Sequence, residues 1–296
     1  MNIFDCTTFY NEKLMMDIRF NILNKYVKKF VVVESEFSHS GKRKKLNFDI
    51  NDYPKFKDKI EYIVIDKEPE DLIQKEDSSN IPNYKRLNSI KRIEQSYQFM
   101  SQGLSDVSEE DLIMISDNDE IPDLTSDDFK NTKNNYIIFE QLFFYYKFDL
   151  LYDRMKWHGT KACRKKRFKS FTSLRNMKNK EYPFWRLDTF FSDIKHIDVK
   201  IIKNGGWHFT NLKTPEELFE KLSNFGHHDE FELSKITVEK LKEKINKKEV
   251  FYNHMLDKSN KSKWDDDYKL KKIDHKLLPE FLILNYQKYK DWFDHS

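Results

Sequence analysis

Residues 112–123 read Leu-Ile-Met-Ile-Ser-Asp-Asn-Asp-Glu-Ile-Pro-Asp. The first four residues are apolar and indicate a buried strand, and Pro122 interrupts a regular continuation of that strand. Asp117, Asp119 and Glu120 therefore follow the carboxyl end of a strand, where ligands bind in open α/β sheets. An Asp-x-Asp pattern supplies the oxygen ligands that Mg²⁺ or Mn²⁺ prefers and leaves metal positions free for a diphosphate. A solvated acidic turn is the alternative, because Asp-x-Asp also occurs by chance in acidic loops.

The order of the predicted elements indicates a parallel sheet covered by helices. Apolar and β-branched runs predict strands at residues 2–6, 30–34, 60–65 and 112–116. Apolar residues that recur every three or four positions predict helices at 12–28 and 86–103. Alternation of strands and helices is typical of α/β proteins. We therefore expect an α/β fold with a mostly parallel sheet and flanking helices.

The second half of the chain is expected to add strands and then helices. Residues 136–146 are aromatic and β-prone, whereas the basic region 150–200 carries no clear pattern. Thr214 followed by Pro215 and two glutamates is typical of a helix start. Further helices are predicted near 234–248 and 279–292. Because no Gly/Ser/Pro-rich linker divides the chain, we expect a catalytic domain over 1–230 and a helical C-terminal extension over 231–296 packed on it.

The composition limits the classes of function. The 53 basic and 50 acidic residues leave a net charge of only +3, which gives no reason to expect nucleic-acid binding. Cys6 and Cys163 are too few for a disulfide framework or a Cys-rich zinc site, so a reducing cytoplasm is the default. No apolar stretch is long enough to span a bilayer, and residues 1–5 show no signal-peptide pattern. We expect a cytoplasmic protein with at most peripheral contact at the inner face of the membrane.

We call residues 117–120, which carry the three acids, the acidic loop. Polar residues follow the two strands that should lie next to this loop in the sheet. Asn11 and Glu12 come after the first strand, and Glu34 ends the second. Since the carboxyl ends of parallel strands share one sheet edge, these residues are candidates for binding uracil and ribose. The alternative is that Asn11 and Glu12 only cap the following helix. The basic run at 38–45 either meets a diphosphate or an anionic acceptor, or is a solvated charge run.

Three further clusters are candidates for a site. In Gly205-Gly206-Trp207-His208-Phe209, two of the six glycines permit close backbone approach. Trp207 offers a sugar-stacking face and His208 a metal or phosphate ligand, with a core histidine as the alternative. The His-His-Asp-Glu run at 227–230 either holds a catalytic carboxylate or is a polar loop at a helix end. The basic run at 164–167 meets phosphate or a membrane surface, or is a solvated face.

Taken together, these segments resemble glycosyltransferase family 17 (β-1,4-mannosyl-glycoprotein β-1,4-N-acetylglucosaminyltransferase-like). The matching segments lie in the family's order over residues 3–230 and include 3–6, 30–35, Ile115 to Pro122, and the Gly-Trp-His-Phe run at 206–209. The Asp-x-Asp-Glu-Ile-Pro and Gly-Trp-His-Phe signatures are specific as a pair. The resemblance implies a GT-A-like fold, a UDP-sugar donor expected to be UDP-GlcNAc, Mn²⁺ or Mg²⁺, and inversion at the anomeric carbon. It also implies a glycan or glycolipid acceptor, in the synthesis of surface glycans.

The resemblance suggests roles for individual residues. Asp119 and His208 are the expected metal ligands, and Asp117 binds the ribose or the metal. An inverting transfer needs a general base, for which Glu230 is the first candidate and Glu120 the second. The residues expected on the donor side are Asn11, Glu12, Arg19, Glu34, Asp117 and Trp207.

Alternatives remain for one residue and for the function. Arg19 has the alternative role of holding Glu34 or Glu12 in place. A nucleotidyl- or phosphosugar transferase on a similar sheet would also need paired acids. A non-catalytic carbohydrate-binding protein would use the aromatic residues as stacking platforms, but it has no need of Asp-x-Asp at a strand end.

Overall fold

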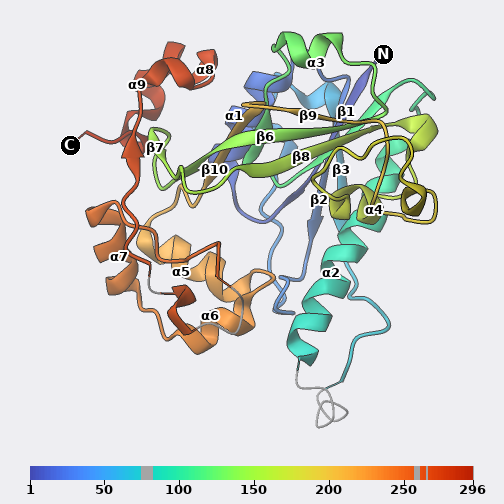
Figure 1. Cartoon of the computed structure of the whole chain (residues 1–296). Helices are drawn as coiled ribbons and strands as arrows, with labels where there is room; N and C mark the ends of the chain where they lie inside the picture. Colours follow the sequence, from blue (N-terminus) through green and yellow to red (C-terminus); the bar gives the residue numbers. More distant parts are fainter. Residues whose placement is uncertain (75–82, 257–260, 265, 296) are drawn as a thin grey trace.

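The computed structural model describes residues 1–74, 83–256, 261–264 and 266–295. Its centre is a parallel sheet in the order β4-β1-β2-β3 (Figure 1). These are the four strands that the sequence predicts, with bounds β1 (Ile3–Phe9), β2 (Lys29–Ser35), β3 (Ile60–Ile65) and β4 (Leu112–Ser116). Strand β1 is longer than predicted because Thr7, Thr8 and Phe9 continue the pairing with β2.

Helices cover both faces of the parallel strands, as an α/β fold requires. One face packs on α1 (Lys13–Leu23) through an apolar cluster that includes Phe20, Phe30, Val32 and Met114. The other face packs on α2 (Tyr84–Met100) and the 3₁₀ turn after it through Met100, Leu104, Val31, Val33 and Ile113. Alternate residues of β2 therefore enter different cores, which explains why the strand is apolar throughout. Helix α1 ends five residues before the predicted end, and α2 begins two residues before the predicted start and gives way to a 3₁₀ turn over Ser101–Leu104.

Antiparallel strands extend the sheet and bring distant segments to the acidic loop. Strand β8 (Trp157–Arg164) pairs with β4, and β6 (Tyr136–Tyr145) pairs with β8. Strands β9 (Val199–Ile202) and β10 (Gly206–Thr210) both run parallel to β6. The three-residue strand β5 (Glu120–Pro122) pairs antiparallel with β10, so that His208 lies opposite Glu120. The two signature segments are thus neighbours in space.

The chain after β10 is mostly helical (Figure 1). Helix α5 (Pro215–Asn224) starts at the predicted capping box on Thr214. The remaining elements are α3 (Asp127–Asn131), β7 (Leu150–Leu151), α4 (Phe171–Asn176), α6 (His228–Ser234), α7 (Val238–Lys247), β11 (Lys271–Lys272), α8 (Glu280–Leu284) and α9 (Tyr286–Tyr289). Two predictions were wrong here. Residues 227–230 begin a helix instead of a loop, and the helix expected at 279–292 is broken at Asn285 into α8 and α9.

The end of the chain packs on the sheet domain. Leu282, Tyr289 and Phe293 are buried in the same core cluster as α1, and β11 pairs with β7 at the sheet edge. The domain boundary at residue 230 stays a prediction. Among the described residues, no helix combines the length and the apolar character that crossing a bilayer requires. The architecture is the α/β fold with flanking helices that the sequence predicts.

Candidate active site

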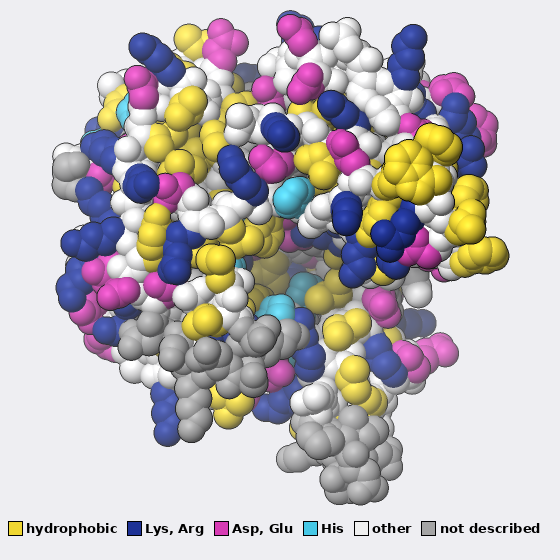
Figure 2. Space-filling view, in the orientation of Figure 1, with side chains coloured by type: hydrophobic (Ala, Val, Ile, Leu, Met, Phe, Trp, Pro, Cys, Tyr) yellow, Lys and Arg dark blue, Asp and Glu magenta, His cyan; other side chains and the backbone are white. Residues whose placement is uncertain are grey.

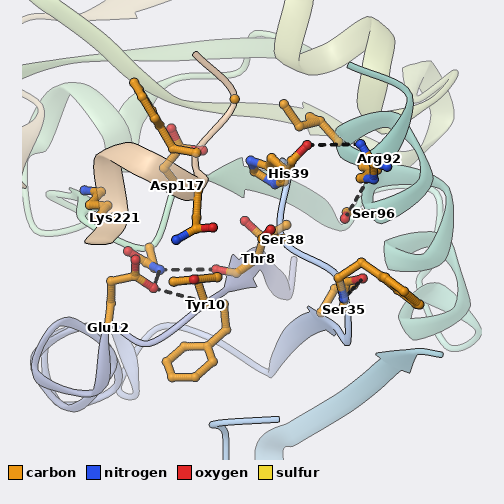
Figure 3. Close-up of a pocket in the computed structure, with 18 of the residues that line it drawn as sticks. Thr8, Tyr10, Glu12, Ser35, Ser38, His39, Arg92, Ser96, Asp117 and Lys221 are labelled. Carbon is orange, nitrogen blue, oxygen red and sulfur yellow. Dashed lines mark hydrogen bonds between the residues drawn. The ribbon is translucent and has the colours of Figure 1, made fainter. Parts of the chain in front are cut away.

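A cavity of about 320 Å³ opens at the carboxyl ends of β1, β2 and β4, the sheet edge where ligands bind in such folds. It lies between this edge, helix α2 and the segment that joins α5 to α6. The face in Figure 2 is hollowed near its centre, and Figure 3 shows the polar groups that converge on the cavity. Its polar lining comprises Thr8, Tyr10, Glu12, Ser35, Ser38, His39, Lys44, Arg92, Ser96, Tyr97, Asp117, Asn118, Asp119, Arg175, Lys221 and Asn224.

Asp119 and His208 form a pair beside this cavity. The Nε2 atom of His208 lies 3.4 Å from Asp119 Oδ1, and Lys221 Nζ lies 3.8 Å from Asp119 Oδ2. Burial alone would raise the pKa of Asp119, but His208 and Lys221 hold that pKa well below its usual range. Asp119 is therefore a carboxylate at neutral pH, as a metal ligand must be.

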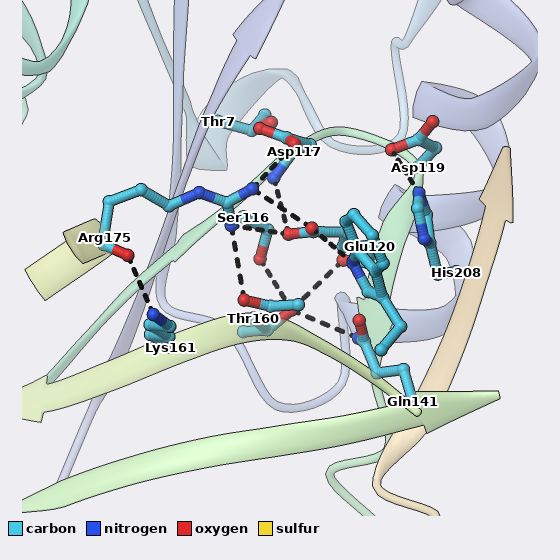
Figure 4. Close-up of polar contacts among 12 residues, drawn as sticks. Thr7, Ser116, Asp117, Asp119, Glu120, Gln141, Thr160, Lys161, Arg175 and His208 are labelled. Carbon is cyan, nitrogen blue, oxygen red and sulfur yellow. Dashed lines mark hydrogen bonds and ion pairs between the residues drawn. The ribbon is translucent and has the colours of Figure 1, made fainter. Parts of the chain in front are cut away.

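The His208 ring is fixed by aromatic neighbours. It stacks on Phe143 with ring centroids 4.6 Å apart, and Trp157 lies at 4.5 Å. Its Nδ1 atom is buried and has no hydrogen-bond partner among the described residues. The ring is thus held by packing, and the nitrogen that faces a polar partner is Nε2, which points at Asp119 (Figure 4).

Arg175 joins the other two acids of the loop. Its guanidinium donates to Asp117 Oδ2 at 2.7 Å and to Glu120 Oε2 at 2.8 Å (Figure 4). Glu120 is fully buried and also accepts from Trp157 Nε1 at 2.8 Å and from the Asp117 amide at 2.9 Å. Burial favours a protonated Glu120, but Arg175, His208 and the Trp157 donor lower its pKa.

Asp117 has a different environment from Glu120. Half of its side-chain surface faces the cavity, with a relative exposure of 54%. The surrounding protein, together with the charges of Glu120 and Asp119, raises the pKa of Asp117 to about 6 against the opposing effect of Arg175. Of the two acids that Arg175 binds, only Asp117 can reach a ligand.

Arg19 supports the acidic loop from behind. It is fully buried and forms a two-point ion pair with Asp5, with distances of 2.7 and 2.5 Å. Its Nη1 atom donates to the Glu120 carbonyl at 2.7 Å and to the Asp117 carbonyl at 3.3 Å. One guanidinium therefore fixes the backbone on which the cavity carboxylates stand.

The family model of glycosyltransferase family 17 matches residues 1–293. This chain belongs to glycosyltransferase family 17. The matched region includes every residue of the acidic loop and of β10. The family assignment makes the cavity beside Asp119 and His208 the candidate active site of a glycosyltransferase.

Other comparisons add little to the family assignment. No curated protein matches the chain. One similar solved structure is the 2-C-methyl-D-erythritol 4-phosphate cytidylyltransferase of Francisella tularensis, with 9% identity, 76% of this chain and 100% of that chain covered, and a TM-score of 0.32. Another is the inositol-1-phosphate CTP transferase from T. maritima, with 13% identity, coverage of 75% and 96%, and a TM-score of 0.34. Likeness at this level carries no argument about the function of the family 17 enzyme.

Several donor-side predictions are not supported by where the residues lie. Arg19 contacts neither Glu34 nor Glu12, and binds Asp5 and the acidic loop instead. Glu34 is fully buried, where it accepts from Tyr62 Oη at 2.8 Å and from the amides of residues 47 and 48, and pairs with Lys44. Glu34 therefore holds residues 44–48 against the sheet, and its carboxylate has no surface on which a donor could bind.

The pair Asn11 and Glu12 separates into two roles. Asn11 does not cap α1; its side chain accepts from Lys213 Nζ at 2.7 Å, and it does not line the cavity. Glu12 does line the cavity, and its Oε2 atom accepts from the Asn118 side chain at 2.8 Å and from the Asn11 amide at 3.0 Å. Glu12 therefore ties the loop after β1 to the acidic loop.

Trp207 lies away from the cavity. Neighbouring residues of a strand point to opposite faces, so Trp207 and His208 cannot both face the site. The Trp207 indole donates to the Leu277 carbonyl at 2.7 Å and packs against the core beside α1. The Trp207 side chain is therefore covered by the C-terminal segment and is not placed to stack on a sugar in the cavity.

Neither predicted general base lines the cavity. Glu120 is enclosed by Arg175 and Trp157. Glu230 is in the first turn of α6, where its carboxylate lies 2.9 Å from His227 Nδ1 and 3.1 Å from Lys263 Nζ. Helix α6 begins directly after Phe225 and Gly226, which do line the cavity.

The sequence did not single out several residues of the site. Arg175 lies in the basic region that showed no pattern, and nothing in its local sequence marks it. Arg92 of α2 pairs with Glu68 at 2.6 Å and donates to the His39 carbonyl at 3.2 Å. Burial, with the charge of Arg92, lowers the pKa of His39 to about 4, so this cavity residue is neutral. The periodicity that predicted α2 rests on its apolar positions and gave no weight to Arg92.

Proposed function

We propose that this family 17 enzyme transfers a sugar, expected to be GlcNAc, from a UDP-sugar to a glycan or glycolipid acceptor, with inversion and with Mn²⁺ or Mg²⁺. The observation that carries the proposal is the pairing of Asp119 with His208 at the edge of the cavity. The two free, buried cysteines, Cys6 and Cys163, agree with a cytoplasmic enzyme. The acceptor is proposed to belong to surface-glycan synthesis.

The residues present fit a divalent cation. Asp119 and His208 would hold it, since a carboxylate oxygen and an imidazole nitrogen face one another there. In the part of the chain that the structure describes, no three acidic, histidine or cysteine side chains gather into a complete metal site. Two protein ligands leave positions for the oxygens of a diphosphate. When bound, the cation supplies positive charge to the leaving diphosphate.

The chain's own residues account for donor binding. Lys221, from α5, lies on the cavity side of Asp119 and is placed to meet an anion. Tyr10 offers an aromatic ring, and Ser35 and Ser38 offer hydroxyl groups. A volume of about 320 Å³ is within the range of small-ligand sites. Asp117, the half-exposed acid, is proposed to accept from the ribose.

Glu230 does not line the cavity, but it stands in the first turn of α6, close in sequence to the lining residues Phe225 and Gly226, and it remains our proposed general base. His227 and Lys263 outweigh the effect of burial and lower the pKa of Glu230, so it is ionised at neutral pH. An ionised carboxylate can take the proton from an acceptor hydroxyl. Glu230→Gln is therefore expected to lower the rate of transfer and to leave the affinity for UDP unchanged. Retention of the full rate would remove Glu230 from the mechanism.

The first test is thermal unfolding with UDP-GlcNAc, with and without Mn²⁺. A donor present at about 100 times its Kd adds about 2.7 kcal/mol of stability, or roughly 5 °C for a chain of this size. We expect this shift to need Mn²⁺ and to disappear in Asp119→Asn. Asp123→Asn is the matched control, because Asp123 follows the same loop but binds Thr125 outside the cavity. Absence of a shift with every nucleotide sugar would refute the proposal.

A further inference from the structure

A cluster of exposed apolar side chains, most of them aromatic, lies between α4 and β9 in the sequence. Five of the fourteen exposed large hydrophobic side chains in the described part of the chain fall within eight residues. They are Phe184, Trp185, Leu187, Phe190 and Phe191, with relative exposures of 75, 67, 72, 65 and 93%. We call residues 184–191 the aromatic loop. Figure 2 shows such a yellow patch at the right of the molecule. Single exposed apolar residues are common, but a contiguous patch marks an interaction surface.

The aromatic loop is a folded element. It contains the 3₁₀ helix Leu187–Thr189, in which Thr189 is buried and its hydroxyl donates to the Arg186 carbonyl at 2.6 Å. Arg186 and Asp188 form an ion pair of 2.6 Å across the turn. The backbone is therefore held by polar contacts, while the aromatic rings are left in solvent.

The segment before the aromatic loop is strongly basic. Residues 161–180 contain nine lysines and arginines and no aspartate or glutamate. Two of the nine bind groups of the protein itself: Lys161 donates to the Met177 carbonyl, and Arg175 pairs with two acids of the acidic loop. The exposed cations of this segment are Lys166, Arg167, Lys169, Lys178 and Lys180, and the exposed Arg186 of the aromatic loop lies beside them. We call these six residues the basic collar.

The basic collar and the aromatic loop form one surface. The Lys178 amide donates to the Ile194 carbonyl at 2.7 Å, which joins the end of α4 to the end of the loop. Lys180 and Arg186 both lie over the Tyr182 ring, at 5.6 and 5.8 Å. Of the nearby acids, Asp188 pairs with Arg186 and Lys195, and Asp193 pairs with Lys169. The carboxylate of the third acid, Glu181, accepts from the Ile201 amide at 2.8 Å. The ion pairs described on this surface involve Lys166, Lys169 and Arg186 and do not involve Arg167, Lys178 or Lys180, so positive charge remains beside the apolar rings.

We propose that the aromatic loop and the basic collar dock this enzyme on an anionic lipid bilayer. Trp, Phe and Leu side chains enter the boundary of headgroups and acyl chains, and lysines and arginines meet the anionic headgroups. A second copy of the chain fits less well, because a two-fold contact would place one basic collar against the other. A glycan is a poorer fit too, since small-molecule sites are concave and these rings protrude. The proposal concerns an interaction surface and does not depend on the identity of the donor.

The test is sedimentation of the purified full chain with vesicles, without nucleotide or metal. Vesicles of phosphatidylcholine alone are compared with vesicles of phosphatidylcholine mixed with phosphatidylglycerol. We expect binding to the anionic vesicles, weakening as salt rises. The triple variant Phe184→Ser, Trp185→Ser, Phe191→Ser and the double variant Lys178→Glu, Lys180→Glu are each expected to bind at least about tenfold more weakly.

A matched control uses exposed apolar residues elsewhere. Leu233 of α6 and Leu284 of α8 are 83 and 76% exposed, so Leu233→Ser with Leu284→Ser removes comparable side chains without touching the loop. This variant is expected to bind like the wild type, and all variants to unfold at the wild-type temperature. Failure of the wild type to bind, equal binding to both vesicle types, or unchanged binding by the triple variant would overturn the proposal. A dimer that the triple variant dissociates, without vesicle binding, would assign the surface to a second copy. Because no donor is present, none of these results bears on the transferase activity.

Discussion

Replacing Arg175 by methionine tests the charge arrangement beneath the active site. In the wild type, the Arg175 guanidinium lies 2.8 Å from Glu120, whose side chain has no exposed surface. Arg175→Met keeps most of the aliphatic stem and removes the charge. Glu120 then keeps only two neutral donors, the Trp157 indole and the Asp117 amide. Breaking a buried ion pair in this way leaves an uncompensated charge.

The expected loss of unfolding free energy is about 3 kcal/mol at neutral pH. Removal of one partner of a buried pair costs about 3–5 kcal/mol, and we take the lower end because the Arg175 side chain is 18% exposed. The pH dependence should also change sign. In the wild type the pKa of Glu120 is below its usual 4.5, so its contribution to stability is present above pH 4.5 and is lost as the pH falls through the folded pKa. In Arg175→Met, burial raises that pKa, so stability is lost as the pH rises above 4.5.

Urea unfolding at pH 5.5 and pH 8 measures both effects. Arg175→Met should be less stable at pH 8 than at pH 5.5, relative to wild type, and adding Glu120→Gln should restore much of the loss. Arg43→Met is the matched control, because Arg43 pairs with Glu36 while 75% exposed. It is expected to change stability by no more than about 0.5 kcal/mol. If Arg175→Met costs as little as Arg43→Met, with the same value at both pH values, Glu120 does not depend on Arg175 and the reasoning fails.

Three other substitutions have defined outcomes. Gly206→Ala should cost about 2 kcal/mol or more in thermal unfolding, because Gly206 has φ of +136° and a Cβ there would lie 2.2 Å from the Ile121 carbonyl oxygen; a wild-type midpoint would contradict this. Trp207→Phe should cost about 1 kcal/mol by loss of the bond to Leu277 and leave UDP affinity unchanged in calorimetry; weaker UDP binding would return Trp207 to the donor site. Burial lowers the pKa of Lys161 to about 8, so folding releases a proton from this side chain above that pH. In urea unfolding, the stability of the wild type relative to Lys161→Met should therefore rise by about 1–2 kcal/mol between pH 8 and pH 10. An equal pH dependence of the two proteins would refute this.

The parallel half of the fold could be predicted because its signals are local. Strands β1 to β4 are short apolar runs, and the helices between them repeat every three or four residues, so a few neighbouring residues suffice for each element. The capping box at Thr214 is equally local and was confirmed. The break at Asn285 was not predictable in this way, since the apolar pattern continues through it. Strands β8 and β9 lie in the basic region, where periodicity was weak.

The residues of the candidate site also differ in whether a local sequence signal could predict them. Asp117, Asp119 and Glu12 follow strand ends, and a rule about sheet edges was enough to bring them to the cavity. The donor-side predictions for Glu34 and Arg19 lack support for a different reason. Both are polar residues close in sequence to predicted site residues. Their side chains face the interior instead, because their partners, such as Asp5 for Arg19, are buried there. Sequence alone does not show whether a polar side chain near a strand end, such as Glu34, or within a helix, such as Arg19, will face the interior or the cavity.

The acidic loop illustrates how support and chemistry are distributed in this enzyme. Arg19 binds the loop through its carbonyls, and Arg175 binds it through two of its carboxylates. Asp119 contacts neither arginine in the described contacts and is left to His208 and Lys221. Arg19 therefore fixes the backbone of the loop, and Arg175 compensates the charges of Asp117 and Glu120, so that Asp119 is the acid of the loop that neither arginine pairs with. Because a loop fixed in advance loses little conformational entropy when a ligand binds, this division favours tight binding at Asp119.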